Sequence, residues 1–213
     1  MTGPIYDVAS LWELVERRAQ LTPDKRMLVD QADREITFGE FRHRCAVVAA
    51  GLHALGIGPG SPVSWQLPSR LETVVLSMAL ARLGAVQNPV IHIYREREVA
   101  FALRQTGAGH FFVPGDWRGF DYLAMARKIA GELPSPPQLH LALDELPEGD
   151  PRTLPPPPAA GAADEVRWVY YTSGTTSEPK GVRHTDRTLL TGGRGLAIAL
   201  EMSEDDVGSI AFP

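Results

Sequence analysis

The chain has 213 residues, of which 44% are hydrophobic and 22% are charged. This is the balance of an ordinary globular protein that can bury a core. The formal charge of −5 comes without a sustained run of either sign, which argues against a nucleic-acid partner, because binding along a phosphate backbone needs a basic surface. A single local anion site is compatible with this balance.

The cysteine content and the N-terminus bear on where the protein works. Cys45 is the only cysteine, and its position on the apolar face of a predicted helix indicates a buried structural thiol. The first residues lack the basic segment and apolar core of a secretion signal. The apolar run at 71–83 is too short to span a bilayer. We therefore expect a cytoplasmic protein.

Several helices are predicted in chain order. Three begin with a capping pattern, in which a hydroxyl residue is followed three positions later by glutamate. The pairs are Ser10 with Glu13, Thr37 with Glu40, and Ser69 with Glu72. Apolar residues recur at helical spacing after each pair, and the third helix is apolar nearly all round, so we expect it to be buried. Two more helical stretches follow near 95–105 and 120–129.

Short runs of β-forming residues alternate with these helices. They occupy residues 63–67, 85–90, 110–113, 139–143 and 166–172. Such alternation implies crossover connections, and hence an α/β fold with a mostly parallel sheet flanked by helices. Residues 207–213 also read as a strand, and because domains seldom end on an apolar strand we expect the sequence to be cut there.

Two segments mark the organisation of the chain. Residues 56–60, Gly-Ile-Gly-Pro-Gly, follow a helix and precede a strand, which is the reverse of a dinucleotide-binding turn, so they predict a helix stop. Residues 147–163 are rich in proline and alanine and predict an extended surface connector. The connector divides the chain into a first α/β subdomain, 1–146, and a second segment, 164–213.

The loop after the strand at 166–172 concentrates hydrogen-bonding groups. Residues 172–181 read Thr-Ser-Gly-Thr-Thr-Ser-Glu-Pro-Lys-Gly, and a helix is expected from near Asp186. Hydroxyl and backbone N–H groups can donate to phosphate oxygens, and the lysine adds a positive charge. A strand–loop–helix order would also aim a helix N-terminus at the anion. These features predict a phosphate-binding loop.

Two familiar loop types do not fit this segment. A Walker A loop needs Gly-Lys-Ser/Thr, whereas Pro179 precedes Lys180 here and Gly181 follows it. A nucleophile elbow needs Gly-x-Ser-x-Gly, a frame that Ser173 lacks. The remaining alternative is a surface loop of small polar residues without a ligand, and the order and spacing favour phosphate binding over it.

Residues 171–182, Tyr-Thr-Ser-Gly-Thr-Thr-Ser-Glu-Pro-Lys-Gly-Val, resemble the AMP-binding signature of the adenylate-forming superfamily, which includes acyl-CoA synthetases, luciferases and peptide-synthetase adenylation domains. Ser177 stands where most members have glycine. Residues 37–41, 56–63 and 81–89 resemble earlier blocks of the family. Within the superfamily, the sequence most resembles medium-chain or cyclohexanecarboxylate-type CoA ligases. The resemblance implies the incomplete N-terminal domain of such an enzyme.

In this family a carboxylate attacks the α-phosphate of MgATP to give an acyl-adenylate and pyrophosphate, and the thiol of CoA then displaces AMP. The resemblance implies that the loop contacts the ATP phosphates through Thr172, Ser173, Gly174, Thr175, Thr176, Ser177 and Lys180. It also implies that Thr172 helps to hold Mg²⁺; the alternative is a strand-end hydroxyl that bonds to the backbone.

The implied substrates are ATP, CoA and a fatty or related carboxylic acid. The family's adenine-binding and acyl-binding loops, and its adenylation lysine, lie further along than residue 213, so no catalytic residue is assigned. We therefore expect the chain alone to be inactive. A different class of function stays open: a non-catalytic remnant that binds a nucleotide or a partner. A kinase or ATPase would need a Walker-type lysine and an acidic metal ligand at a strand end, and the sequence has neither arrangement.

Overall fold

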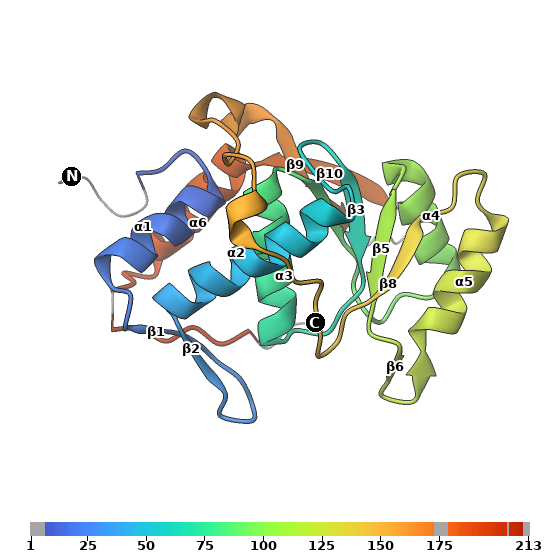
Figure 1. Cartoon of the computed structure of the whole chain (residues 1–213), viewed down its shortest axis with the longest axis horizontal. Helices are drawn as coiled ribbons and strands as arrows, with labels where there is room; N and C mark the ends of the chain where they lie inside the picture. The colour runs from blue at the N-terminus through green and yellow to red at the C-terminus, as the bar shows by residue number, and fades with distance from the viewer. Residues whose placement is uncertain (1–6, 173–178, 204, 211–213) are drawn as a thin grey trace.

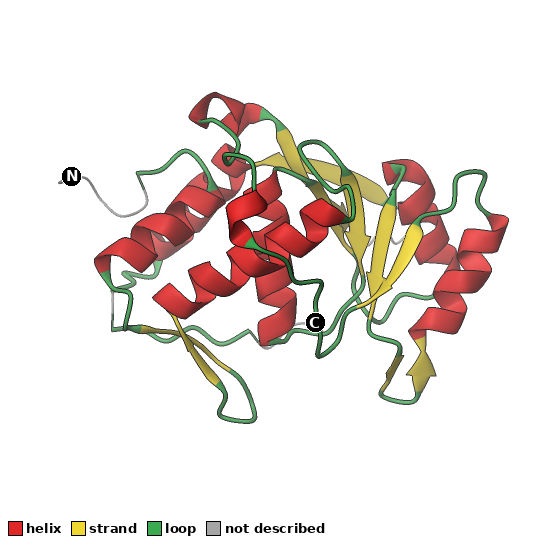
Figure 2. Ribbon diagram, viewed as in Figure 1, coloured by secondary structure: helices red, strands yellow, loops and turns green. Residues whose placement is uncertain are grey.

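The computed structural model describes residues 7–172, 179–203 and 205–210. A six-stranded sheet in the order β10-β9-β4-β3-β5-β8 forms the centre of the molecule (Figures 1 and 2). Its strands are β3 (Pro62–Trp65), β4 (Val86–Pro89), β5 (His110–Val113), β8 (Gln138–Leu141), β9 (Val166–Thr172) and β10 (Lys180–Thr185). Neighbouring strands are parallel except β9 and β10, which are antiparallel. The predicted α/β class with a mostly parallel sheet is confirmed.

Helices cover both faces of this sheet. They are α1 (Leu11–Leu21), α2 (Phe38–Ala54), α3 (Leu71–Leu83), α4 (Glu96–Thr106), α5 (Tyr122–Glu132) and α6 (Asp186–Ala199). Figure 1 shows α1, α2 and α3 packed together on one side, and α4 and α5 on the other. In the part of the chain that the structure describes, none of the helices has the length and apolar composition needed to cross a bilayer.

Two small hairpins lie outside the central sheet and were not predicted. One pairs β1 (Arg26–Val29) with β2 (Glu35–Thr37), and the other pairs β6 (Asp116–Trp117) with β7 (Phe120–Asp121). Both turns use a residue other than glycine at positive φ, Asp33 at 56° and Arg118 at 50°. In the second turn Gly119 is also at positive φ, 77°, as is usual for tight hairpin turns, whereas the first turn lacks the asparagine or glycine that would have marked it in the sequence.

The helix starts confirm two of the three predicted caps. The hydroxyl of Ser10 accepts from the backbone N–H of Glu13 at 3.1 Å, and Thr37 forms a complete capping box with Glu40. The cap predicted at Ser69 is wrong, because Arg70 occupies the N-cap of α3 and makes no side-chain cap hydrogen bond. The carboxylate of Glu72, which a capping box would need, is occupied by arginines.

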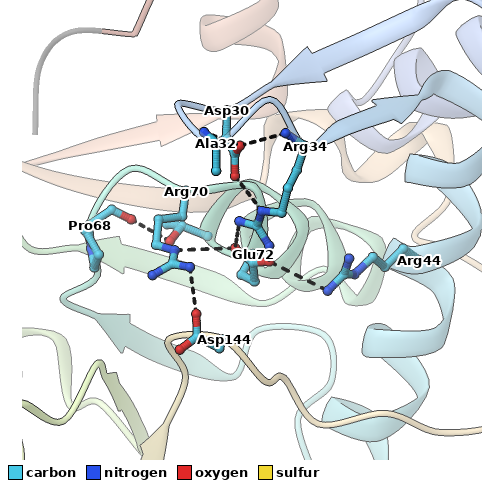
Figure 3. A network of polar contacts seen from close by, with 9 residues as sticks. Asp30, Ala32, Arg34, Arg44, Pro68, Arg70, Glu72 and Asp144 are labelled. Carbon is cyan, nitrogen blue, oxygen red and sulfur yellow. Dashed lines mark hydrogen bonds and ion pairs between the residues drawn. The ribbon is translucent and has the colours of Figure 1, made fainter.

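Glu72 is the centre of a buried ionic network (Figure 3). Its carboxylate is 2% exposed and accepts two hydrogen bonds from Arg34, at 2.8 and 3.2 Å. Arg70 lies 3.6 Å away and pairs in turn with Asp144 at 2.6 Å. The network ties the β1–β2 hairpin to the start of α3 and to the segment after β8. Burial raises the pKa of Glu72, but the hydrogen bonds and charge of Arg34 outweigh it and leave that pKa lowered.

The core lies in two apolar clusters, one on each side of the sheet. Cys45 is fully buried in the cluster under α2 and α3, and burial raises the pKa of its thiol. The prediction of a structural thiol is therefore confirmed. The second cluster joins α4 and α5 to the sheet through residues such as Val99, Phe111 and Ile129.

The segment 147–163 contains two short 3-10 helices, η1 (Pro151–Thr153) and η2 (Ala160–Asp164). Its start packs against α2, where the amide of Gly149 donates to the carbonyl of Val47 at 3.0 Å. Further on, Arg82 of α3 donates to the carbonyl of Pro155 at 2.7 Å. The segment is thus docked on the helices. Division of the chain into domains at this segment stays a prediction, and the central sheet contains strands from before and after it.

The strand predicted at 207–213 is wrong for the part that the structure describes. Residues 207–210 form no strand, and Val207 is 96% exposed. An apolar run forms a strand only when a neighbouring strand pairs with it, and none does so among the described residues. Residues 211–213 lie outside the described part.

Candidate functional site

The predicted phosphate loop is bracketed by two paired strands. Thr172 is the last residue of β9, Lys180 is the first residue of β10, and the two lie opposite each other in the antiparallel ladder. Both side chains are exposed, so both are available to a ligand. The other predicted site residues, Ser173, Gly174, Thr175, Thr176 and Ser177, lie outside the described residues.

The position of the loop in the sheet favours ligand binding. Strand β9 runs parallel to β4, and through it to β3, β5 and β8. Thr172 therefore lies at the carboxyl edge of the parallel strands, which is where open α/β sheets bind their ligands.

The predicted strand–loop–helix order is wrong. Strand β10 follows the loop, and α6 begins only after the cap residue Thr185 at its far end. Six residues of strand place the helix N-terminus roughly 20 Å from the loop, so its dipole does not act on an anion there. Strand β10 was not predicted, because its polar residues Arg183 and His184 hide the alternation of apolar and polar residues that marks a strand.

Gly181 lets the hairpin approach α4 closely. A Cβ at this position would lie 3.0 Å from Cγ1 of Val169 and 3.2 Å from Oε1 of Gln105. The same Oε1 accepts a 2.6 Å hydrogen bond from the hydroxyl of Tyr171, and burial raises the pKa of that hydroxyl. The lack of a side chain at Gly181 thus makes room for a contact that steadies the end of β9.

A small hollow adjoins the end of the loop. Its volume is about 90 Å³, and it is lined by Val90, Tyr94, Glu98, Tyr171 and Pro179 among others. The lining is mainly apolar and aromatic, and the hollow is too small for a nucleotide or a long acyl chain. A wider, open depression lies beside β8, at the opposite edge of the sheet from β10.

The described residues could supply only a small part of the ligands of a magnesium ion. Among them, no group of three or more His, Cys, Asp or Glu side chains is placed to hold a metal ion. The hydroxyl of Thr172 is an exposed oxygen of the kind that Mg²⁺ accepts, and Mg²⁺ usually takes its remaining ligands from phosphates and water. The arrangement fits an ion that arrives with a phosphate ligand.

His184 and Asp186 lie near the far end of β10. Nδ1 of His184 is 3.3 Å from the hydroxyl of Thr188 in the first turn of α6. Asp186 is buried, and burial raises the pKa of its carboxyl. Neither residue belongs to the loop.

Sequence reasoning missed one side chain that supports the loop strand. The buried amide of Asn88 in β4 donates from Nδ2 to the carbonyl of Val169 in β9 at 3.1 Å. The available signal was a polar residue inside an otherwise buried strand, because such a group must find a partner.

Comparison with known proteins identifies the class to which this fold and loop belong. The family model described as AMP-binding enzyme matches residues 15–212. The chain therefore belongs to the AMP-binding enzyme family, and it carries the α/β fold of the N-terminal domain of adenylate-forming enzymes.

Individual relatives are ligases. The chain is 28% identical to the medium-chain fatty-acid–CoA ligase of Escherichia coli, over 98% of this chain and 38% of the ligase. It is 28% identical to the salicyl-AMP ligase/salicyl-S-ArCP synthetase of Mycobacterium tuberculosis, over 95% of this chain and 39% of that protein.

Among solved structures, O-succinylbenzoate coenzyme A synthetase of Bacillus subtilis in complex with AMP superposes with a TM-score of 0.78 at 25% identity. The match covers 96% of this chain and 49% of that one. The chain thus spans less than half the length of each of these three proteins.

Proposed function

We propose that this chain carries the ATP-phosphate-binding part of a ligase that activates a carboxylic acid and joins it to CoA. A carboxylate oxygen attacks the α-phosphorus of ATP, the bond to the β-phosphate breaks, and pyrophosphate leaves. The thiol sulfur of CoA then attacks the acyl carbon, and AMP leaves as the thioester forms. Membership of the AMP-binding family supports this reaction class.

The observation that carries the proposal is the pairing of Thr172 with Lys180 across the β9–β10 hairpin. It brings an exposed hydroxyl and an exposed ammonium to the two ends of one loop, at the carboxyl edge of the sheet. The proposed phosphate ligands are Thr172, Ser173, Gly174, Thr175, Thr176, Ser177 and Lys180. Such a loop acts by holding the β- and γ-phosphates in position and by balancing the charge of the leaving pyrophosphate.

Thr172 is the proposed protein ligand of Mg²⁺. When bound, the ion would neutralise phosphate charge, and it would take most of its ligands from ATP and water. The chain's own contribution is the position of the Thr172 hydroxyl, which the β9–β10 ladder fixes opposite Lys180.

The proposed acid is a fatty or related carboxylic acid, with CoA as the thiol acceptor. The E. coli relative is named for a medium-chain fatty acid and the M. tuberculosis relative for salicylate, so the acid class is proposed broadly. Because the reaction consumes ATP and CoA, we propose that the protein works in the cytoplasm.

Carboxylate-dependent exchange of labelled pyrophosphate into ATP tests the function directly. The full-length natural protein is incubated with ATP, Mg²⁺ and a panel of fatty and aromatic acids. Exchange with at least one acid, followed by a CoA thioester when CoA is added, is the expected result. Nucleotide binding without exchange for any acid would contradict the proposal and would favour the non-catalytic binding module.

A further inference from the structure

The β9–β10 hairpin joins the rest of the sheet through a shorter ladder than the one that joins its two strands to each other. Strands β9 and β10 pair in one register from Lys180 opposite Thr172 to His184 opposite Trp168, and the register shifts only at Thr185, which lies opposite Val166. The ladder between β9 and β4 is confined to the position where Gln87 lies beside Trp168. Beyond that position β9 is held by side chains: the hydroxyl of Tyr171 donates to Gln105 of α4 at 2.6 Å, and a second link comes from β4.

The side chain of Asn88 supplies an attachment one residue further along β4. Its Nδ2 donates to the carbonyl of Val169 at 3.1 Å, and its Oδ1 accepts from the hydroxyl of Ser64 at 3.2 Å. The carbonyl of Val169 can only accept, which fixes the orientation of the amide and leaves Oδ1 for the hydroxyl. The side chain therefore links β3, β4 and β9 in one chain of hydrogen bonds.

Burial makes this link strong and hard to replace. Asn88 is 1% exposed and Ser64 is 0% exposed, so water has little access to these two side chains. Loss of the amide would remove a partner from the half-buried Val169 carbonyl and from the buried Ser64 hydroxyl, at a cost of about 1–3 kcal/mol for each group left unsatisfied. The hairpin would instead shift to recover the lost bonds.

We propose that Asn88 is a positioning residue for the phosphate loop. Val169 precedes Thr172 by three residues, a distance of about 10 Å along the strand, so a shift of β9 at Val169 carries Thr172 with it. Because Lys180 is paired with Thr172, both ends of the loop move together. This inference rests on the proposed ATP-binding function. It implies that Asn88 affects the binding of ATP separately from the binding of the acid.

A matched control lies next to Asn88 on the same strand. Gln87 is also fully buried, but its amide donates to the carbonyl of Ser77 in α3 and accepts from the indole N–H of Trp65 in β3. Gln87→Ala therefore removes a buried amide of comparable cost without removing the link to Val169. A general loss of stability would affect both variants alike.

The first test is amide hydrogen exchange on the full-length protein without substrates. In Asn88→Ala, the amides of residues 169–172 and 180–183 should exchange about tenfold faster, as expected for the loss of one buried hydrogen bond. In Gln87→Ala the same amides should be unchanged while α3 loosens. Equal acceleration of the hairpin in both variants, or none in Asn88→Ala, would overturn the anchoring.

The second test uses the enzyme and a substitution that can be switched by pH. In Asn88→Asp a protonated carboxyl can still donate to Val169, whereas a carboxylate can only accept and faces a carbonyl. Burial favours the neutral form. The ratio of the variant's KM for MgATP to that of the natural enzyme, both measured at the same pH, should therefore rise as the pH rises. The KM for the acid should stay within about twofold of the natural enzyme's value. Asn88→Ala should give an elevated ratio at every pH.

Two outcomes separate this inference from the proposed function. A ratio for Asn88→Asp that does not change with pH, or a KM for the acid that rises as much as that for MgATP, would overturn the positioning role. Absence of pyrophosphate exchange in the natural enzyme would contradict the proposed function. The hydrogen exchange experiment would then still decide whether Asn88 anchors the hairpin.

Discussion

At the residue scale, Glu72 shows how a charge is kept inside this fold. Its carboxylate is 2% exposed, whereas the arginines that surround it are partly in water, with Arg34 43% and Arg70 29% exposed. The arginines thus keep part of their hydration while they supply the hydrogen bonds that the buried carboxylate has lost. The net lowering of the Glu72 pKa shows that these bonds outweigh burial.

Glu72→Gln should lower the free energy of unfolding by about 2 kcal/mol at pH 7, the range for hydrogen bonds to charged groups. Because the folded-state pKa of Glu72 is lowered, its contribution is complete above the ordinary glutamate pKa of about 4.3 and is lost as the pH falls below it. Urea unfolding at pH 7 and at lower pH measures the difference between variant and natural chain, which should shrink on acidification.

Glu35→Gln is the control for this prediction. Glu35 pairs with Arg26 at 3.2 Å, but both side chains are more than half exposed, and such surface pairs contribute little. Equal effects of the two substitutions at pH 7 would contradict the view that the buried network stabilises the fold.

The same network explains what could be predicted residue by residue. The caps at Ser10 and Thr37 followed from local sequence, because each hydroxyl bonds within its own turn. The cap at Ser69 failed because Glu72 is bound by Arg34, a residue 38 positions away in sequence. Local patterns cannot show such a competitor.

At the element scale, the segment 147–163 is docked by close backbone contacts with α2. A Cβ at Gly51 would lie 2.4 Å from the carbonyl carbon of Pro147, and a Cβ at Gly149 would lie 2.8 Å from the carbonyl carbon of Ala50. Both contacts are with backbone, which cannot move aside as a flexible side chain can. The two glycines therefore allow α2 and the segment to cross.

Gly51→Ala should lower the free energy of unfolding by about 1–3 kcal/mol, the usual cost of overpacking, although alanine is the better helix former. Gly161→Ala, in the same segment, is the control because a Cβ there meets nothing within 4 Å. Chemical denaturation of the two variants makes the comparison. A Gly51→Ala chain as stable as the control would show that the crossing tolerates a side chain.

The central strands and flanking helices were predictable because they are apolar and regular. The strands at 110–113 and 166–172 have the predicted bounds, and the others differ by a few residues at their ends. Strand β10 was not predictable in the same way, since it contains the polar residues Arg183 and His184 and lies at the edge of the sheet. For the candidate site, the sequence predicted the loop and its flanking lysine, whereas the link from Asn88 to Val169 joins segments 81 positions apart.

At the scale of the whole molecule, the C-terminal part exposes apolar side chains. On α6 and just after it, Leu196, Ile198 and Leu200 are each about 60% exposed, and Met202, Val207 and Ile210 are exposed as well. Exposed apolar surface of this kind promotes association. The described fold does not cover it.

The isolated chain of residues 1–213 should therefore self-associate or unfold with low cooperativity. Analytical ultracentrifugation and a thermal melt, recorded at several protein concentrations, measure both properties. Replacing Leu196 and Ile198 with serine should reduce association without changing the melt of the sheet. A concentration-independent monomer with a sharp two-state transition would contradict this prediction.

Lys180 provides the most direct test that the loop between β9 and β10 serves ATP in carboxylate activation. Pyrophosphate exchange and acid binding are measured for the full-length natural protein, for Lys180→Ala, and for Arg183→Ala, which removes an exposed cation from the same strand. Lys180→Ala should lose pyrophosphate exchange by about a hundredfold, the cost of about 3 kcal/mol for one group that stabilises the transition state, while acid binding is retained. Arg183→Ala should stay close to the natural enzyme. Unchanged exchange in Lys180→Ala, or an equal loss in both variants, would remove the loop from the mechanism.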